Sequence, residues 1–165
     1  MDGAAGSRVL VAGIGNVFAR DDGFGSEVAR RLAGRTWPDG VRVVDYGIRG
    51  MHLAYDLLEP WDALVLVDAV PDRGHVGAVA VLEITPSDVR AGAQVDAHGM
   101  DPATVLATLA ALGGRLPPRT LLVGCQVADT GEGMGLSAPV AAAVDAALRV
   151  VDPLLSRGLH PSGVA

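Results

Sequence analysis

The sequence predicts a three-layer α/β sandwich, in which a mainly parallel, twisted sheet of five strands lies between helices on both faces. Strand-like and helix-like segments alternate along the chain, which is typical of βαβ units. Most strand-like segments are apolar throughout, as expected of strands buried on both faces of a parallel sheet. Neither a repeat nor a linker divides the chain. We therefore expect one domain over residues 1–165, with a core at about 8–155 and flexible ends.

The strands are predicted from short runs rich in Val, Leu and Ile that end at Gly, Pro or polar residues. These runs cover residues 8–14, 41–46, 63–67, 78–84 and 120–125. The helices are predicted from apolar residues at helical spacing, with Gly or Pro marking several of the ends. They cover residues 22–34, 50–58, 102–112 and 137–155.

Charge excludes several classes of function. The formal net charge is −6, and all 13 basic residues are Arg, without a basic run. Such a chain is a poor candidate for binding nucleic acid or an anionic membrane surface. The absence of Lys also excludes a P-loop, whose Lys contacts the phosphates, and any mechanism that needs a Lys Schiff base.

The single cysteine, Cys125, cannot form an intramolecular disulfide, which favours a reducing compartment. The N-terminus does not resemble a signal peptide, and no apolar run approaches the roughly 18 residues that span a bilayer. We therefore expect a soluble, cytoplasmic protein. Cys125 follows an apolar stretch and is expected to be a small packing residue rather than a nucleophile.

The candidate site lies where strands end, because open α/β sheets bind ligands beyond the carboxyl ends of their strands. Asp22 follows the first predicted strand, Asp68 follows the third, and His98 comes after the fourth. Two carboxylates and an imidazole can bind a divalent metal such as nickel, or activate a water molecule as a general base. Their spacing is too wide for a local metal motif, so the fold must bring them together.

Each of these residues also has a simpler interpretation. Asp22 stands where a helix begins and could cap it, a role compatible with a functional one. Asp68 ends an apolar strand, where a carboxylate is costly to bury without a partner. His98 lies in a polar loop, where an isolated histidine is usually a surface residue. Asp21 and Asp45 either support the site or are exposed.

Several motifs together resemble the nickel–iron hydrogenase maturation proteases. They are VLVAGIGN (9–16), DDGFG (21–25), DYG (45–47) with Gly50-Met51, LVDAV (66–70), DAHGM (96–100) and GLSAP (135–139). The motifs have the order and spacing of that family, and the resemblance covers about residues 8–155. A set of motifs in the right order is far more specific than any one of them.

The resemblance implies a five-stranded sheet between helices and an endopeptidase of the aspartyl type. It implies that Asp22, Asp68 and His98 are the catalytic and metal-binding residues, and that they grip nickel already carried by the hydrogenase large-subunit precursor. The enzyme then removes a C-terminal extension from that partner, and the nickel is a recognition handle rather than a resident cofactor. The first ligand position often holds Glu in the family. Asp22 is one methylene shorter, which can alter the distance to the metal.

Three other functions make different demands on the sequence. A Gly-x-Gly after the first strand suggests nucleotide binding, but Phe18 stands where the third glycine of that fingerprint should be. A serine hydrolase would need a Gly-x-Ser-x-Gly elbow, which the sequence lacks. A non-catalytic nickel-binding protein or metallochaperone would use the same three residues, so the sequence leaves this alternative open.

Overall fold

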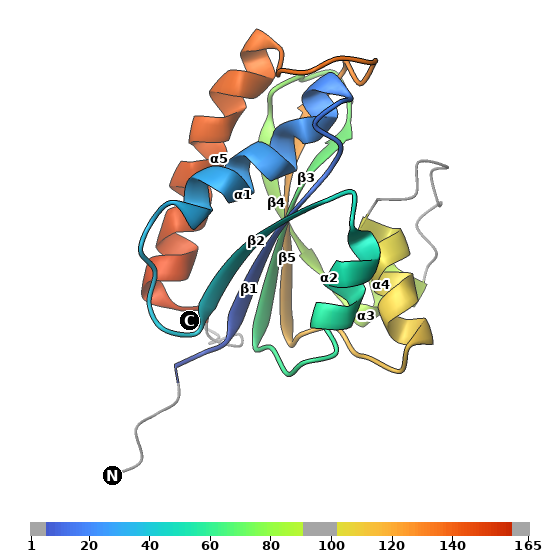
Figure 1. Cartoon of the computed structure of the whole chain (residues 1–165), viewed down its shortest axis with the longest axis vertical. Helices are drawn as coiled ribbons and strands as arrows, with labels where there is room; N and C mark the ends of the chain where they lie inside the picture. Colours follow the sequence, from blue (N-terminus) through green and yellow to red (C-terminus); the bar gives the residue numbers. More distant parts are fainter. Residues whose placement is uncertain (1–5, 91–101, 160–165) are drawn as a thin grey trace.

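The computed structural model describes residues 6–90 and 102–159, and it confirms the predicted fold class (Figure 1). A five-stranded sheet has the order β2-β1-β3-β5-β4. The first four strands in this order are parallel, and β4 is antiparallel to β5. The strands are β1 (Val9–Ile14), β2 (Val41–Gly47), β3 (Ala63–Pro71), β4 (Val79–Ile84) and β5 (Arg119–Val127).

Helices cover both faces of the sheet. In Figure 1, α1 and α5 lie together on one side of the sheet, and α2, α3 and α4 lie on the other. The helices are η1 (a 3-10 turn, Arg20–Gly23), α1 (Phe24–Ala33), α2 (Gly50–Asp56), α3 (Pro86–Arg90), α4 (Pro102–Ala111) and α5 (Ala138–Arg157). The short elements η1 and α3 were not predicted. Within the described ranges, no helix combines the length and apolarity needed to cross a membrane.

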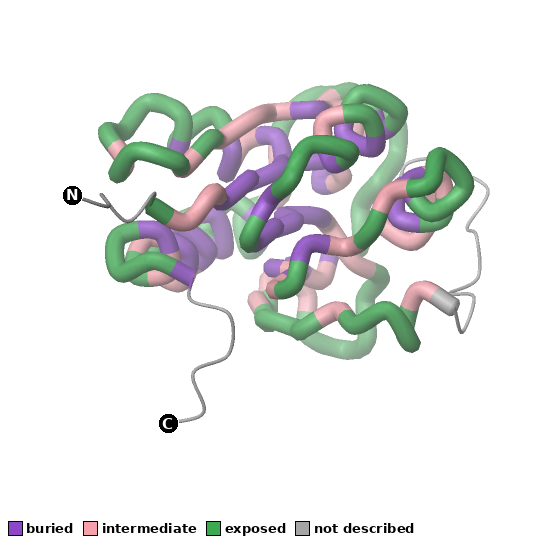
Figure 2. Tube along the Cα trace, turned by 90° about the horizontal axis from the view of Figure 1, so that it is seen from below, coloured by how far each residue is buried: buried purple, intermediate pink, exposed green. Residues whose placement is uncertain are grey.

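The core has two parts, one on each face of the sheet, and β1 contributes to both. Its residues Val9 and Val11 pack into the cluster under α1 and α5, whereas Leu10, Ala12 and Ile14 pack under α2 and α4. Since successive side chains of a strand point to opposite faces, a central strand needs apolar residues at every position. This explains the unbroken apolar run. Figure 2 shows the buried stretches gathered inside the molecule, with exposed chain around them.

The direction of β4 corrects one step of the site prediction. Val79 pairs with Cys125 and Ile84 with Thr120, so β4 runs back toward the start of β5. The connection from Pro71 to Val79 is too short for the crossover of a dozen or more residues that a parallel strand requires. The carboxyl end of β4 therefore lies at the opposite edge of the sheet from the ends of β1 and β3. The position of His98 after the fourth strand in the sequence is therefore not a reason to expect it near Asp22 and Asp68.

The strand order reverses between β1 and β3. From β1 the chain passes through α1 to β2 on one side, and from β2 it passes through α2 to β3 on the other. The carboxyl ends of β1 and β3 thus border the crevice in which open α/β sheets bind ligands. The first turn of α1 is seated against these ends, because Gly25 has no side chain there. A Cβ on Gly25 would lie 2.2 Å from the carbonyl oxygen of Val67 and 2.4 Å from that of Ile14.

Candidate functional site

Asp22 lies at the crevice on a loop that folds back over the end of β1. We call residues 15–23 the Asp22 loop. The Asp22 Oδ2 accepts a hydrogen bond of 2.9 Å from the Asn16 N–H, and the Asn16 side chain accepts another from the Phe18 N–H. Gly15 has φ +141°, and a Cβ there would lie 2.0 Å from the Asp22 carbonyl oxygen. The sequence feature Gly-x-Gly-Asn therefore shapes a tight loop that presents a half-buried carboxylate.

The structure does not support the capping role for Asp22. The N-cap of α1 is Gly23, and no side chain caps this helix end by a hydrogen bond. Asp22 belongs instead to the 3-10 turn η1 that precedes α1. Its described hydrogen bond joins two parts of the same loop, which fixes the direction of its carboxylate toward Asn16.

Asp68 lies inside β3, not after its end as the sequence suggested. It pairs with Gly124 of β5, and β3 continues to Pro71. Asp68 is only 6% exposed. It directly follows Val67, whose carbonyl faces Gly25, and η1 contacts β3. Asp68 thus lies in one of the two strands that border the crevice, deeper in the sheet than expected, and Asp22 lies in the turn that follows the other strand.

The third predicted residue, His98, lies outside the described residues, as does Asp96. Within the described part of the chain, the side chains of His, Cys, Asp and Glu form no group of three that could hold a metal ion. The structure therefore brings together the elements that carry Asp22 and Asp68, and it leaves the placement of His98 a prediction.

Asp21 and Asp45, for which exposure was one interpretation, are both engaged in hydrogen bonds. Asp21 is 1% exposed, and its carboxylate accepts bonds from the N–H of Ser137 (2.6 Å) and from the Ser137 hydroxyl (2.9 Å). Asp45 accepts bonds from the Ser26 hydroxyl (2.7 Å) and the Gly47 N–H (3.0 Å). No local sequence pattern could have paired Asp21 with Ser137, because 116 positions separate them.

Cys125 is a packing residue, as predicted. It is fully buried in β5 and belongs to the apolar cluster under α1 and α5. Burial, together with the negative charge of nearby Asp21, raises the pKa of the thiol to about 11. A thiolate is the nucleophilic form of cysteine, and at neutral pH this side chain is almost wholly protonated.

We expect native protein to react with iodoacetamide at pH 7.5 at least about tenfold more slowly than protein unfolded in urea, and Cys125→Ser to retain peptidase activity. The pKa of the Cys125 thiol is higher in the folded protein than in the unfolded chain, so folding favours the protonated thiol. The resulting contribution to the free energy of unfolding is complete below about pH 9 and is lost as the pH rises toward 11. Mass spectrometry of the alkylated protein measures the rate. Rapid labelling of the folded protein, or loss of activity in correctly folded Cys125→Ser, would contradict this account.

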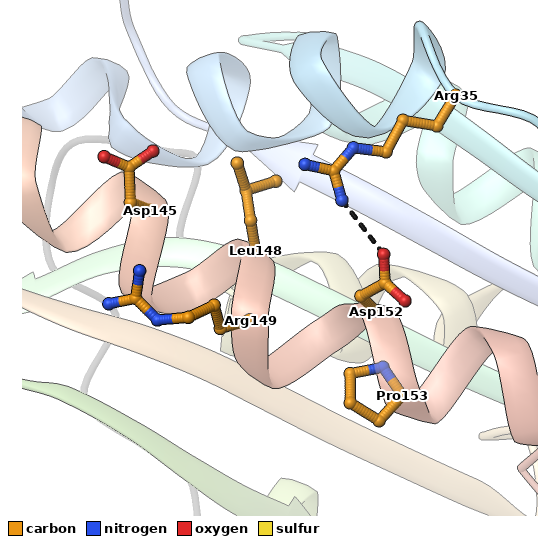
Figure 3. A pocket seen from close by; sticks show the side chains of 6 residues that line it. All are labelled: Arg35, Asp145, Leu148, Arg149, Asp152 and Pro153. Carbon is orange, nitrogen blue, oxygen red and sulfur yellow. Dashed lines mark hydrogen bonds and ion pairs between the residues drawn. The ribbon is translucent and has the colours of Figure 1, made fainter.

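Two surface hollows formed by described residues lie away from Asp22 and Asp68. One, of about 560 Å³, is lined by residues of α5 and by Arg35, which follows α1 (Figure 3). Arg35 reaches across it to Asp152, at 2.9 Å. Asp152 lies far along α5 from Ser137, toward the other edge of the sheet. A second hollow, of about 290 Å³, runs along β2 and α2. Neither places a carboxylate at the crevice, so we do not assign them to the site.

Comparison with known proteins identifies the family of this chain. The family model described as hydrogenase maturation protease matches residues 26–153. The hydrogenase expression/formation protein HoxM of Azotobacter vinelandii is 34% identical over 156 residues, which cover 92% of this chain and 74% of HoxM.

Solved structures give the same result. The hydrogenase maturating endopeptidase HybD from E. coli has a TM-score of 0.74 and 27% identity, and covers 89% of this chain and 91% of its own. The [NiFe] hydrogenase maturation protease HybD from Thermococcus kodakarensis has a TM-score of 0.70 and 26% identity, and covers 90% and 99%. With the family match spanning most of the chain, these similarities identify this protein as a member of the hydrogenase maturation protease family and therefore as a peptidase.

Proposed function

We propose that this peptidase removes the C-terminal extension of a nickel–iron hydrogenase large-subunit precursor after nickel has been inserted. The observation that carries the proposal is the position of Asp68 in β3 and of Asp22 in the turn that follows β1, in a chain of this family. The hydrogenase precursor is the protein partner in this proposal, and its nickel is substrate cargo.

The donor set suits this cargo. Asp22 and Asp68 would hold the nickel of the precursor together with His98, because imidazole and carboxylate are both suitable ligands for nickel. The sequence position of His98, shortly before α4, is the reason to propose it as the third member. In Figure 1, the chain leaves the last turn of α4 toward the start of β5, so the first turn of α4 is the end of the helix farther from that strand start. This end faces the same edge of the sheet as the carboxyl ends of β1 and β3.

Docking of the nickel would place the scissile peptide bond beside the two carboxylates. Holding the reacting groups together in this way is itself a large part of catalysis. Two routes to hydrolysis then fit the residues. Either a carboxylate takes a proton from the attacking water, as in an aspartyl protease, or the nickel polarises the peptide carbonyl or the water. In both routes Asp22, Asp68 and His98 have catalytic as well as binding roles.

The shorter side chain at position 22 fits the loop that carries it. The tight turn at Gly15 brings the backbone of Asp22 back over β1, where its carboxylate bonds to the Asn16 N–H. An Asp therefore reaches the crevice from a backbone that is already close. A cytoplasmic location stays a prediction based on the single cysteine.

The test is cleavage of the matching large-subunit precursor, prepared with and without nickel and followed by mass spectrometry. We expect loss of one C-terminal peptide from the nickel-loaded precursor and no change in the nickel-free form. No cleavage of a matched, loaded precursor, combined with tight binding of nickel by the isolated chain, would support the metallochaperone alternative instead.

A further inference from the structure

The Asp22 loop is tied to a second loop that is far away in the sequence. We call residues 128–137, between β5 and α5, the glycine-rich loop. Three backbone hydrogen bonds join the two loops. The Arg20 N–H donates to the Gly133 carbonyl (2.9 Å), and the Gly133 N–H donates to the Phe18 carbonyl (2.9 Å). The Asp21 N–H donates to the Asp129 carbonyl (3.0 Å). Ala19 and Gly133 form a short parallel bridge. The Asp22 loop is thus paired with the glycine-rich loop as two strands are.

The buried side chain of Asp21 completes this connection. Its two carboxylate oxygens accept separate bonds from the backbone N–H and the hydroxyl of Ser137, the N-cap residue of α5. Charge-assisted bonds of this kind are about twice as strong as neutral ones, and the N-terminus of a helix favours a negative charge. Asp21 therefore anchors the Asp22 loop to a 20-residue helix that is packed on the sheet.

The backbone next to Asp21 is strained and is held by the same contacts. Arg20 has φ +49°, a conformation that side chains other than glycine seldom adopt. Its guanidinium lies over Gly133, where a Cβ would be 2.9 Å from the guanidinium carbon, and its Nε donates to the Glu132 carbonyl (3.2 Å). Strain of this kind persists only where the surroundings hold it.

We propose that Asp21 is a positioning residue that sets the direction of the Asp22 carboxylate. The inference rests on the proposed function of Asp22. Neighbouring residues in a 3-10 turn point about 120° apart, so the direction of one fixes the other. Asp21 points to Ser137, and Asp22 consequently points to Asn16 and the crevice. Releasing Asp21 would let η1 rotate and carry Asp22 away from the substrate.

The first readout does not depend on activity. The Asn16 N–H donates to the Asp22 carboxylate, so its hydrogen exchange reports whether that carboxylate is in place. We expect Asp21→Ala to speed this exchange at least about tenfold, with little change in the amides of β1, and Asp21→Asn, which keeps an acceptor for the Ser137 N–H, to restore most of the protection. Unchanged exchange of Asn16 in Asp21→Ala would overturn the proposal whether or not the precursor is cleaved.

The second readout is cleavage of nickel-loaded precursor. We expect Asp21→Ala to lower kcat/KM about tenfold or more at a temperature well below its melting point, with partial recovery in Asp21→Asn. Glu132→Ala is the matched control: its exposed carboxylate belongs to the same loop pair, but only its backbone carbonyl bonds to the Asp22 loop, through the Arg20 Nε. It should stay within about twofold of wild type. Wild-type cleavage by Asp21→Ala would overturn the positioning role, whereas failure of the wild type itself would count against the proposed function alone.

A second pair of variants tests the contact between the loops. Gly133→Ala places a methyl group against the Arg20 guanidinium at a backbone φ of +139°, and should reproduce the faster Asn16 exchange of Asp21→Ala. Gly131→Ala is its control, because a Cβ there meets only the Asp129 carboxylate, at 3.5 Å. Equal exchange rates in the two glycine variants would contradict the proposal.

Discussion

Cleavage of nickel-loaded precursor is expected to fall at least about 100-fold in Asp68→Asn and in His98→Ala, since general base catalysis alone contributes roughly 10²–10⁴-fold. Asn keeps the shape of the Asp68 side chain but removes its charge, so it can neither take a proton nor balance the charge of nickel. Ala at position 98 removes the proposed imidazole ligand. The measurement is the initial rate of release of the C-terminal peptide, followed by mass spectrometry.

Matched controls separate the site from general effects of substitution. Asp72→Asn changes an exposed carboxylate just after β3, and His75→Ala removes an exposed histidine from the turn that follows. Both should cleave within about twofold of the wild-type rate. Thermal unfolding should show that Asp68→Asn is folded at the assay temperature. A folded Asp68→Asn or His98→Ala enzyme with normal activity would refute the assignment of that residue.

Gly25→Ala is expected to cause the largest loss of stability. The added methyl group would lie 2.2 Å and 2.4 Å from the carbonyl oxygens of Val67 and Ile14, in the two central strands. These are backbone atoms of a buried sheet, so α1 must move instead. Overpacking costs about 1–3 kcal/mol and occasionally more, out of a total stability of about 5–15 kcal/mol. We expect about 3 kcal/mol in urea unfolding, together with reduced cleavage, because η1 moves with α1.

Gly34→Ala is the matched control, because it changes a glycine at the other end of the same helix. Gly34 has φ −77°, which any residue adopts, and the nearest atom to a Cβ there is the Arg31 carbonyl oxygen at 3.5 Å. Gly→Ala at such a position stabilises by about 0.4–1 kcal/mol, because it restricts the unfolded chain. If Gly25→Ala unfolds at the same urea concentration as Gly34→Ala, then α1 is not seated against the strands as described.

The architecture was predictable because its signals are local. An apolar run with no polar face, such as 9–14, can be satisfied only in the middle of a covered sheet, and the structure places it there. The helices of the core were also found, with ends differing by a few residues. The direction of β4 could have been predicted from the short connection after Pro71, which does not allow a parallel crossover.

The site was less predictable because its contacts are not local. The motifs pointed to Asp22 and Asp68, and the topology explains why the elements that carry them, η1 and β3, contact each other. The continuation of β3 past Asp68 was missed because a carboxylate normally ends an apolar run, while here the pairing with β5 carries the strand on to Pro71. The role of Asp21 could not be predicted, because it depends on Ser137, which is 116 positions away in the sequence, and on two loops that meet only in the folded protein.

The bond between Asp21 and Ser137 also orders the events of protein synthesis. The ribosome makes the Asp22 loop before it makes Asp129, Gly133 and Ser137, which hold that loop. The strand β5, which pairs with β3, is also made after the Asp22 loop and before Ser137. A nascent chain that has not reached α5 therefore carries Asp22 on an unanchored loop. Under the proposed function, peptidase activity therefore arises only after the ribosome has passed Ser137.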